Sequence, residues 1–353
     1  MSDIIEKFLE SQNRLVTQSS DLSLDSIASM VDSGAIDVSP GYQRRERWSI
    51  EKESALIESF ILNIPVPPIY LAEDEYGKYT VIDGKQRVTA IYKFMKTDQK
   101  LKKLERFTEL ENFTLSNLPS QLKNALTIRP YIRVVTLLNQ SDPNLKYEVF
   151  TRLNTGGDNL LSQEVRNVAF RGPLNDLIFE LSANEFLRRQ LKIVTKNEKV
   201  YKEMVDAEYV LRFFTIRCYW NNFPGNMNIA MNNFMNEFRF AENNYIEEFR
   251  QLFNSAMNIC QRIWGDNAFH RPAGEDYRRL MLQGFYDVQM VPISFYLNRE
   301  FSDGQIGNIR EAFYDLYAND DEFQDSIRQF TSNSQRVSYR IGKMRELIER
   351  ILA

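Results

Sequence analysis

The pattern of apolar and polar positions divides the chain into two parts of different character. Up to about residue 140, alternating runs typical of β-strands are interspersed with helical patterns, whereas helical patterns dominate beyond residue 143. We therefore predict an α+β protein, with a small mixed α/β domain over residues 1–140 and an all-helical domain over residues 141–353.

In the first part, turn residues and periodicity locate the elements. Asp74-Glu75-Tyr76-Gly77 separates two alternating runs, which predicts a hairpin with a four-residue turn. Ser49 is a good N-cap for the helix that follows it. The Lys/Glu-rich stretch 96–112 is typical of a solvated excursion. The expected strands are 69–72, 78–82 and 131–138, and the expected helices are 22–31, the segment after Ser49, and 88–96.

In the second part, apolar residues recur three and four positions apart. The expected helices are 143–153, 162–170, 174–182, 206–220, 244–263, 276–298, 306–318 and 339–352. Residues 221–244 predict a loop followed by an amphipathic helix. Five aromatic residues at helical spacing favour a place in the core over base stacking, namely Tyr209, Phe213, Phe214, Tyr219 and Trp220.

Composition limits the classes of function. The chain has 353 residues, which exceeds the usual limit of roughly 250–300 residues for a single core, so one large or two fused domains are expected. With a net charge of −4, any DNA contact needs a local basic patch. The N-terminus does not resemble a signal peptide and no run of ~18 apolar residues occurs, so we expect a soluble cytoplasmic protein without a membrane partner.

The single histidine, His270, excludes several kinds of catalytic site. Zinc sites of the H-E-x-x-H type, Ser-His-Asp triads and two-histidine metal nucleases all require histidines that this chain lacks. Cys218 and Cys260 have no C-x-x-C spacing and are predicted to be buried free thiols.

The most informative segment runs from Tyr79 to Ile91. An alternating β-branched run ends in Asp83-Gly84, and Lys85, Gln86 and Arg87 then open a helical pattern. A helix start presents N–H groups without intrahelical partners and the positive end of the helix dipole. Because a guanidinium binds phosphate through paired hydrogen bonds, the segment predicts a phosphate site. Asp83-Gly84 also has a simpler interpretation as the residues that make the turn.

Two further segments carry candidate chemistry. Residues 42–48 place three arginines beside Trp48, although a solvated turn anchored by the tryptophan would have the same pattern. Residues 150–157 end a predicted helix in Asn-Thr-Gly-Gly, and the diglycine permits positive φ and close approach of the backbone to a ligand. An ordinary turn between two helices is the alternative.

Together these segments resemble the N-terminal domain of GmrSD-type modification-dependent restriction systems, in the ParB/sulfiredoxin-like superfamily. The similarity rests on Pro-x-Tyr-Gln-Arg with a tryptophan four residues later, on Val-Ile-Asp-Gly-x-Gln-Arg, and on Phe-x-Arg-Leu-Asn-x-Gly-Gly followed by Glu-x-Arg. It covers residues ~20–170. Lys85 departs from the glutamine of many members but keeps polarity and adds charge. Residues 332–340, with Ser-Asn-Ser, a valine and an arginine, also look familiar.

The resemblance implies a nucleotide-handling domain and assigns candidate residues. The implied catalytic residues are Asp83, Gln86 and Arg87. The implied nucleotide-binding residues are Arg44, Gly84, Lys85, Arg87, Asn154, Gly156, Gly157 and Arg166. The implied ligands of a Mg²⁺ ion are Asp83 and Glu164. A cleft between the two domains would then hold the nucleotide, with residues from both sides.

Our leading hypothesis is a nucleoside triphosphate-binding and hydrolysing sensor or regulatory subunit of a DNA-targeting prokaryotic defence system. Such systems usually cut DNA with a His-Asn-His nuclease, which one histidine cannot supply, so the nuclease is expected on another chain. The implied partners are a nucleotide and DNA or a DNA-acting protein, with self-association left open. The alternatives are a ParB-like Mg²⁺-dependent DNA endonuclease and a non-catalytic DNA-binding or scaffold module.

Overall fold

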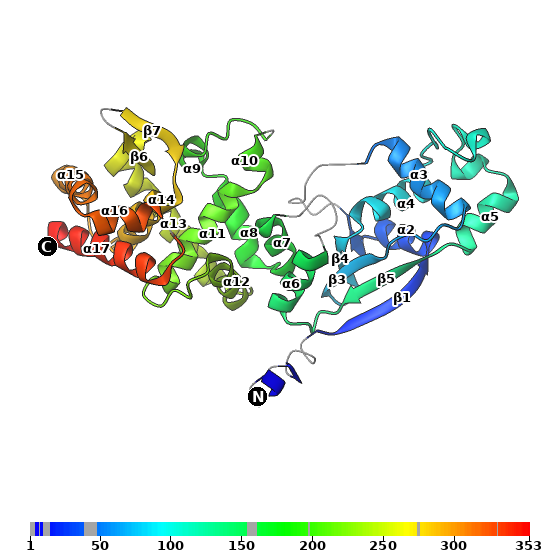
Figure 1. Ribbon diagram of the computed structural model, residues 1–353, viewed down its shortest axis with the longest axis horizontal. Helices are drawn as coiled ribbons and strands as arrows, with labels where there is room; N and C mark the ends of the chain where they lie inside the picture. Colours follow the sequence, from blue (N-terminus) through cyan, green and yellow to red (C-terminus); the bar gives the residue numbers. More distant parts are fainter. Residues whose placement is uncertain are drawn as a thin grey trace. The chain divides into compact units, whose positions relative to one another are not determined.

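The computed structural model describes residues 4–6, 8–9, 15–38, 48–153, 161–196, 198–273, 276–329 and 331–353. The chain forms two compact units, Met1–Leu160 and Leu161–Ala353. Figure 1 shows the larger sheet in the first unit and a mainly helical second unit. The α+β fold class predicted from the sequence is therefore confirmed.

A five-stranded mixed sheet forms the centre of the first unit. Its strand order is β1-β5-β3-β4-β2, with antiparallel pairing of β1 with β5 and of β3 with β4, and parallel pairing of β5 with β3 and of β4 with β2. The strands are β1 (Thr17–Ser23), β2 (Ile36–Asp37), β3 (Ile69–Glu75), β4 (Lys78–Asp83) and β5 (Tyr131–Leu137). The predicted hairpin is present, but β3 extends to Glu75, so the turn is shorter than expected.

Helices pack against this sheet or against one another. They are α2 (Leu24–Asp32), α3 (Ile50–Ile61), α4 (Lys85–Lys96), α5 (Ser120–Ile128) and α6 (Pro143–Leu153). Ser49 caps α3 as predicted, since its side chain accepts a hydrogen bond from the Lys52 N–H. Ile27 of α2, Phe94 of α4 and Val134 of β5 meet in one buried apolar cluster. The turn that precedes α4 is thus held by a packed helix and a paired strand.

Residues 96–112 are not the solvated excursion that their charge suggested. Leu101, Leu104 and Leu110 are buried in the same apolar cluster. The buried carboxylate of Glu58 on α3 accepts backbone N–H bonds from residues 105, 106 and 107 at 3.1, 2.7 and 2.9 Å. Leucines at irregular spacing therefore enter the core without forming a long helix.

The second unit is built from helices and one hairpin. The helices are α7 (Ser162–Ala169), α8 (Pro173–Ser182), α9 (Glu185–Gln190), α10 (Lys199–Lys202), α11 (Val205–Tyr219), α12 (Met227–Glu237), α13 (Asn243–Trp264), α14 (Gln283–Ile293), α15 (Asp303–Asn319), α16 (Asp321–Arg328) and α17 (Ser334–Leu352). The hairpin pairs β6 (His270–Ala273) with β7 (Asp276–Met281). None of the helices in the described part of the chain is long and apolar enough to cross a membrane.

Three expectations for the second unit were wrong or only partly right. The expected helix at 276–298 begins only at Gln283, because residues 276–281 pair with β6 instead, and long-range pairing overrides a local helical pattern. Of the two cysteines, Cys260 is buried but Cys218 is exposed. In the aromatic stretch of α11, Tyr209, Phe213 and Phe214 are in the core as predicted, while Tyr219 and Trp220 are only half-buried.

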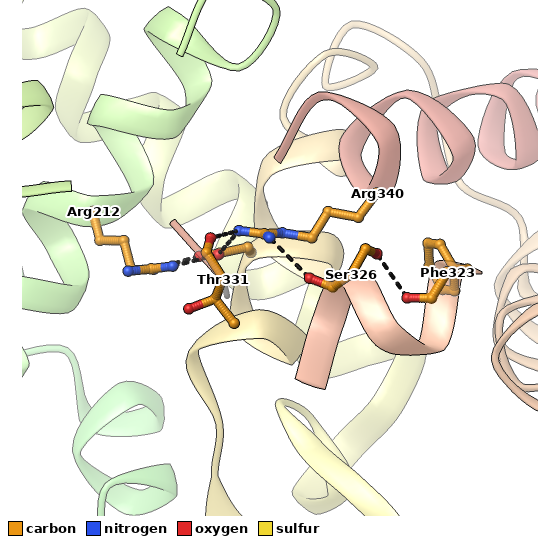
Figure 2. Close-up of polar contacts among 6 residues, drawn as sticks. Arg212, Phe323, Ser326, Thr331 and Arg340 are labelled. Carbon is orange, nitrogen blue, oxygen red and sulfur yellow. Dashed lines mark hydrogen bonds and ion pairs between the residues drawn. The ribbon is translucent and has the colours of Figure 1, made fainter. Parts of the chain in front are cut away.

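A buried ionic cluster ties α11, α14 and α17 together. Arg212 donates from Nε and Nη2 to the two carboxylate oxygens of Asp287, each at 2.7 Å, and Arg340 Nη2 donates to Asp287 Oδ2 at 2.7 Å. Figure 2 shows Arg340 also reaching the carbonyl oxygens of Ser326 and Thr331. Burial is the main cause that lowers the pKa of Arg340, to about 10. We call Arg212, Asp287 and Arg340 the buried triad.

Candidate functional site

The turn between β4 and α4 depends on glycine at residue 84. Gly84 has φ 94° and ψ 14°, a left-handed conformation that glycine adopts without strain. A Cβ atom there would lie 3.0 Å from Nη2 of Arg87 and 3.1 Å from Cγ1 of Ile69. Gly84 therefore serves both the chain reversal and the close approach of the Arg87 side chain.

The start of α4 concentrates positive charge. The first helical bond joins the Val88 N–H to the Gly84 carbonyl, and the first turn contains Lys85 and Arg87 but no acidic residue. Cations at this end oppose the helix dipole, whereas an anion there would be stabilised by the dipole, typically by 0.3–1 kcal/mol at exposed positions. The two cations in the first turn thus lower the stability of the helix on its own, but they favour the binding of an anion at its start.

Arg87 is held from two sides. Its Nη2 donates to Asp83 Oδ2 at 2.6 Å and to the Pro68 carbonyl oxygen at 3.0 Å. Its Nε is buried without an acceptor, and its Nη1 makes no hydrogen bond with the described residues. The side chains are 14% exposed for Arg87 and 37% for Asp83. The guanidinium is therefore fixed in place while part of its donor capacity is unused.

The contact with Pro68 could not be found from the sequence. Any residue type offers a backbone carbonyl, so no side-chain signal marks the one that accepts from Arg87. The three prolines at residues 65, 67 and 68 indicated only the end of a helix.

Gln86 connects the start of α4 to the segment before α3. Its Oε1 accepts a hydrogen bond from the Trp48 N–H at 3.1 Å, and Trp48 packs against the apolar core. This bond orients the side-chain amide, so its oxygen is committed to the protein's own backbone. Arg44, which was expected to line the same pocket, lies outside the described residues.

The predicted site residues that follow residue 160 belong to the second unit. Glu164 is 1% exposed, and its Oε2 accepts from the Leu161 N–H at 2.7 Å, which caps the start of α7. Arg166 is fully buried and donates to the side-chain oxygens of Gln163, Asn228 and Asn232 at 3.3, 2.6 and 3.0 Å. Both side chains thus have structural contacts within their own unit, and their part in nucleotide binding stays a prediction.

The remaining predicted site residues cannot be placed relative to the others. Asn154, Gly156 and Gly157 lie outside the described residues. Among the residues that the structure describes, no group of three or more His, Cys, Asp or Glu side chains could hold a metal ion. A Mg²⁺ ion that binds with a nucleotide usually takes only one or two protein carboxylates and fills its shell with phosphate oxygens and water. Asp83 fits that lesser requirement, because its Oδ1 makes no hydrogen bond with the described residues.

The comparisons with known proteins agree with these motifs. Residues 27–171 match the family model described as the GmrSD restriction endonuclease, N-terminal domain. The matched stretch contains all three motifs on which the resemblance rests. The search of curated proteins and the search of solved structures gave no match. Residues 27–171 thus match the family that the sequence motifs predicted.

Proposed function

We propose that this protein binds and hydrolyses a nucleoside triphosphate at the start of α4. In this proposal it is a sensor or regulatory subunit of a DNA-targeting defence system, and a partner protein cleaves the DNA. The observation that carries the proposal is Arg87, which is half-buried and fixed by Asp83 and Pro68 but keeps donors unused at a helix start. The match to a restriction-system family supports the wider role.

Charge favours a triphosphate over a neutral ligand. Lys85 and Arg87 stand at the positive end of α4, and the first turn of the helix has no acidic residue. A phosphate group would accept hydrogen bonds from the guanidinium and from backbone N–H groups of the helix start. Its negative charge would also offset the two cations that oppose the helix dipole.

The neighbouring side chains suggest distinct roles. Asp83 anchors Arg87 through Oδ2, so its Oδ1 would be the atom that orients water or shares in holding Mg²⁺. Mg²⁺, when bound, would neutralise charge on the phosphate oxygens. Gln86 is oriented by the Trp48 N–H, and its amide nitrogen would donate to a phosphate or to the base. Lys85 would supply a point charge near the outer phosphates.

The test is nucleotide binding and turnover by the purified full chain with ATP, GTP, CTP and UTP, in Mg²⁺, with and without DNA. We expect Arg87→Ala to weaken binding by about tenfold to a hundredfold, the usual effect of losing a charge-assisted hydrogen bond of about 1.5–3 kcal/mol. Arg133→Ala is the matched control. Its guanidinium also pairs with an aspartate, Asp21, but on the exposed strand pair of β1 and β5 instead of at the first turn of a helix.

The outcomes separate the candidate functions. Turnover that is lost in Arg87→Ala and kept in Arg133→Ala would support a nucleotide-driven enzyme, and stimulation by DNA would support the sensor role. Tight binding without turnover would indicate a nucleotide-gated switch. No binding of any nucleotide would overturn the proposal and leave nuclease and scaffold functions, which a DNA-cleavage assay distinguishes.

A second variant tests whether the helical unit contributes to the pocket. Arg166→Ala should also weaken nucleotide binding if both units supply ligands. Because Arg166 holds Asn228 and Asn232 through hydrogen bonds, the variant must first be shown to fold by circular dichroism. A folded Arg166→Ala protein with unchanged nucleotide affinity would restrict the site to the first unit.

A further inference from the structure

Two arginines share one aromatic ring near the ends of α11 and α14. The Cζ atoms of Arg217 and Arg345 lie 3.6 and 4.2 Å from the centroid of the Phe295 ring. Arg345 Cζ is also 4.8 Å from the ring of Trp220, and the Trp220 and Phe295 rings meet nearly edge-on at 78°. We call these four residues the arginine–aromatic cluster. All four are half-buried, so the cluster has an accessible side.

Neither guanidinium in the cluster has an ionic partner. Among the described residues of the second unit, no carboxylate forms an ion pair with Arg217 or Arg345. Their guanidinium groups also donate no hydrogen bond to a carboxylate or carbonyl oxygen there. The Nε atom of each is buried without an acceptor. Arg340 of the buried triad also has a buried Nε without an acceptor, but the triad arginines differ because their other guanidinium atoms donate to a carboxylate and to carbonyl oxygens.

No carboxylate of the described residues forms an ion pair with either guanidinium of the cluster. Burial, and then the nearby charge of Arg345, lower the pKa of Arg217 below its ordinary value. The carboxylate of Glu237 influences the adjacent Cys218, but it accepts its hydrogen bond from the Tyr219 hydroxyl at 2.6 Å. Two like charges on one ring are costly to hold together unless an anion lies between or beside them.

One neighbour on the Arg345 side is a hydroxyl group. Burial, and then the charge of Glu349, raise the pKa of Tyr296, while the Arg345 side chain opposes that rise. The Tyr296 hydroxyl itself donates to the backbone carbonyl oxygen of Arg345 at 3.2 Å. A neutral hydroxyl does not balance the charge of a guanidinium, and no carboxylate in the described part of the chain, Glu349 included, forms an ion pair with Arg345.

Packing alone explains only part of this arrangement. A cation over an aromatic ring gains about 0.5–1 kcal/mol at exposed sites, and Arg217 in the last turn of α11 gains from the helix dipole. Those gains explain why the guanidiniums stack on aromatic rings, but they do not explain why two guanidiniums without anionic acceptors lie so close together. A ligand with several acceptor oxygens and a negative charge would complete the donors on the accessible side and supply the missing counter-charge.

We propose that the arginine–aromatic cluster binds the phosphate backbone of a nucleic-acid strand. Guanidinium groups bind phosphate through paired hydrogen bonds, and aromatic rings beside them stack on bases of any sequence. Trp220, half-buried next to Arg345, is the aromatic surface for an adjoining base. This site is separate from the nucleotide site proposed above and would let the same protein contact nucleic acid despite its net charge of −4.

The experiment measures the affinity of the full chain for a fluorescein-labelled 15-nucleotide oligothymidine by fluorescence anisotropy, without nucleoside triphosphate. Arg217→Gln and Arg345→Gln should each weaken binding on the order of tenfold near 50 mM salt, and each should flatten the salt dependence by about 0.7 in log–log slope. Arg350→Gln is the matched control, because it removes the same charge from an exposed position on the same helix.

Three results would overturn the proposal. They are no binding of the oligonucleotide by the wild type, an equal loss in Arg350→Gln, and binding of inorganic phosphate at the cluster without any binding of the oligonucleotide. A variant that unfolds is replaced by Arg217→Lys, which keeps the charge and must retain part of the affinity and of the salt slope. Thermal unfolding adds a second criterion, since a purely structural arginine would lower the Tm and leave binding unchanged. Because no nucleoside triphosphate is present, failure here leaves the nucleotide proposal intact.

Discussion

Each unit of this protein contains an arginine–aspartate arrangement, and the two are built for different purposes. In the buried triad the exposed fractions of Arg212, Asp287 and Arg340 are at most 2%. At the start of α4, Arg87 is 14% exposed and Asp83 is 37% exposed. The same two side-chain types therefore form an arrangement in the protein interior and another at an accessible helix start.

The difference lies in exposure and in the use of the carboxylate oxygens, since the Nε atoms of both Arg340 and Arg87 are buried without an acceptor. Both oxygens of Asp287 accept from arginines, and Arg340 donates in addition to two backbone carbonyl oxygens. Asp83 uses one oxygen, and Arg87 leaves Nη1 without a partner among the described residues. Buried ion pairs whose carboxylate accepts at both oxygens hold a fold together, whereas accessible pairs with an unused carboxylate oxygen are the ones that a ligand can complete.

The largest expected effect is therefore on the triad. Asp287→Asn should lower the free energy of unfolding by about 3–5 kcal/mol, because it leaves two buried guanidiniums without their counter-charge. Urea denaturation followed by circular dichroism measures the change. Asp83→Asn is the comparison, with an expected loss within about 1 kcal/mol because its carboxylate is partly solvated. Equal losses in the two variants would contradict the distinction between the buried and the accessible arrangement.

A smaller effect should follow from a methyl group in the turn before α4. Gly84→Ala should cost roughly 2–3 kcal/mol, because it adds contact with Arg87 to the strain of a positive φ. Gly77→Ala carries the strain alone, since Gly77 has φ 77° and no heavy atom lies within 4 Å of the place that its Cβ would occupy, so about 1 kcal/mol is expected. Thermal unfolding gives both values. Similar losses would mean that the approach of Arg87 to Gly84 is not tight.

The sequence predicted the accessible arrangement better than the buried one. Asp83, Gly84 and Arg87 are neighbours in the chain, so the turn, the helix start and the ion pair follow from local rules. Asp287 lies 75 positions from Arg212 and 53 positions from Arg340, and no local pattern connects them. Of the triad, only Arg340 stood out in the sequence, through its similarity to a family pattern.

Strands that depend on a distant partner were missed for the same reason. Residues 17–23 are mostly polar and carry no apolar alternation, yet they form β1 because β5 supplies the hydrogen bonds. Residues 276–281 form a hairpin with β6 instead of the start of a helix. Helices with a continuous apolar stripe, such as α13 and α6, were located to within one residue at each end.

The smallest expected effect concerns Glu58, a buried carboxylate of the first unit whose hydrogen bonds come from backbone N–H groups and not from an arginine. Burial acts to raise the pKa of Glu58, but three backbone N–H donors from residues 105–107 outweigh it and lower the pKa below the ordinary value of 4.5. A lowered pKa means that the folded state binds protons less readily than the unfolded state. The stabilisation is then fully present above about pH 4.5 and is lost as the pH falls through the folded-state value.

Glu58→Gln should accordingly lower the free energy of unfolding by roughly 1–2 kcal/mol at pH 7, the size of a hydrogen-bond loss at a charged acceptor. The gap between wild type and variant should stay constant down to about pH 5 and shrink below it. Glu105→Gln removes the same charge from an exposed side chain in the segment that donates to Glu58, and it should stay within about 0.5 kcal/mol of wild type. Urea denaturation at pH 3.5, 5 and 7 provides the comparison. The difference in free energy of unfolding between wild type and Glu58→Gln could instead be the same at all three pH values. The three N–H bonds would then not depend on the charge of the carboxylate. Backbone donors could then not take the place of arginine as partners of a buried acid.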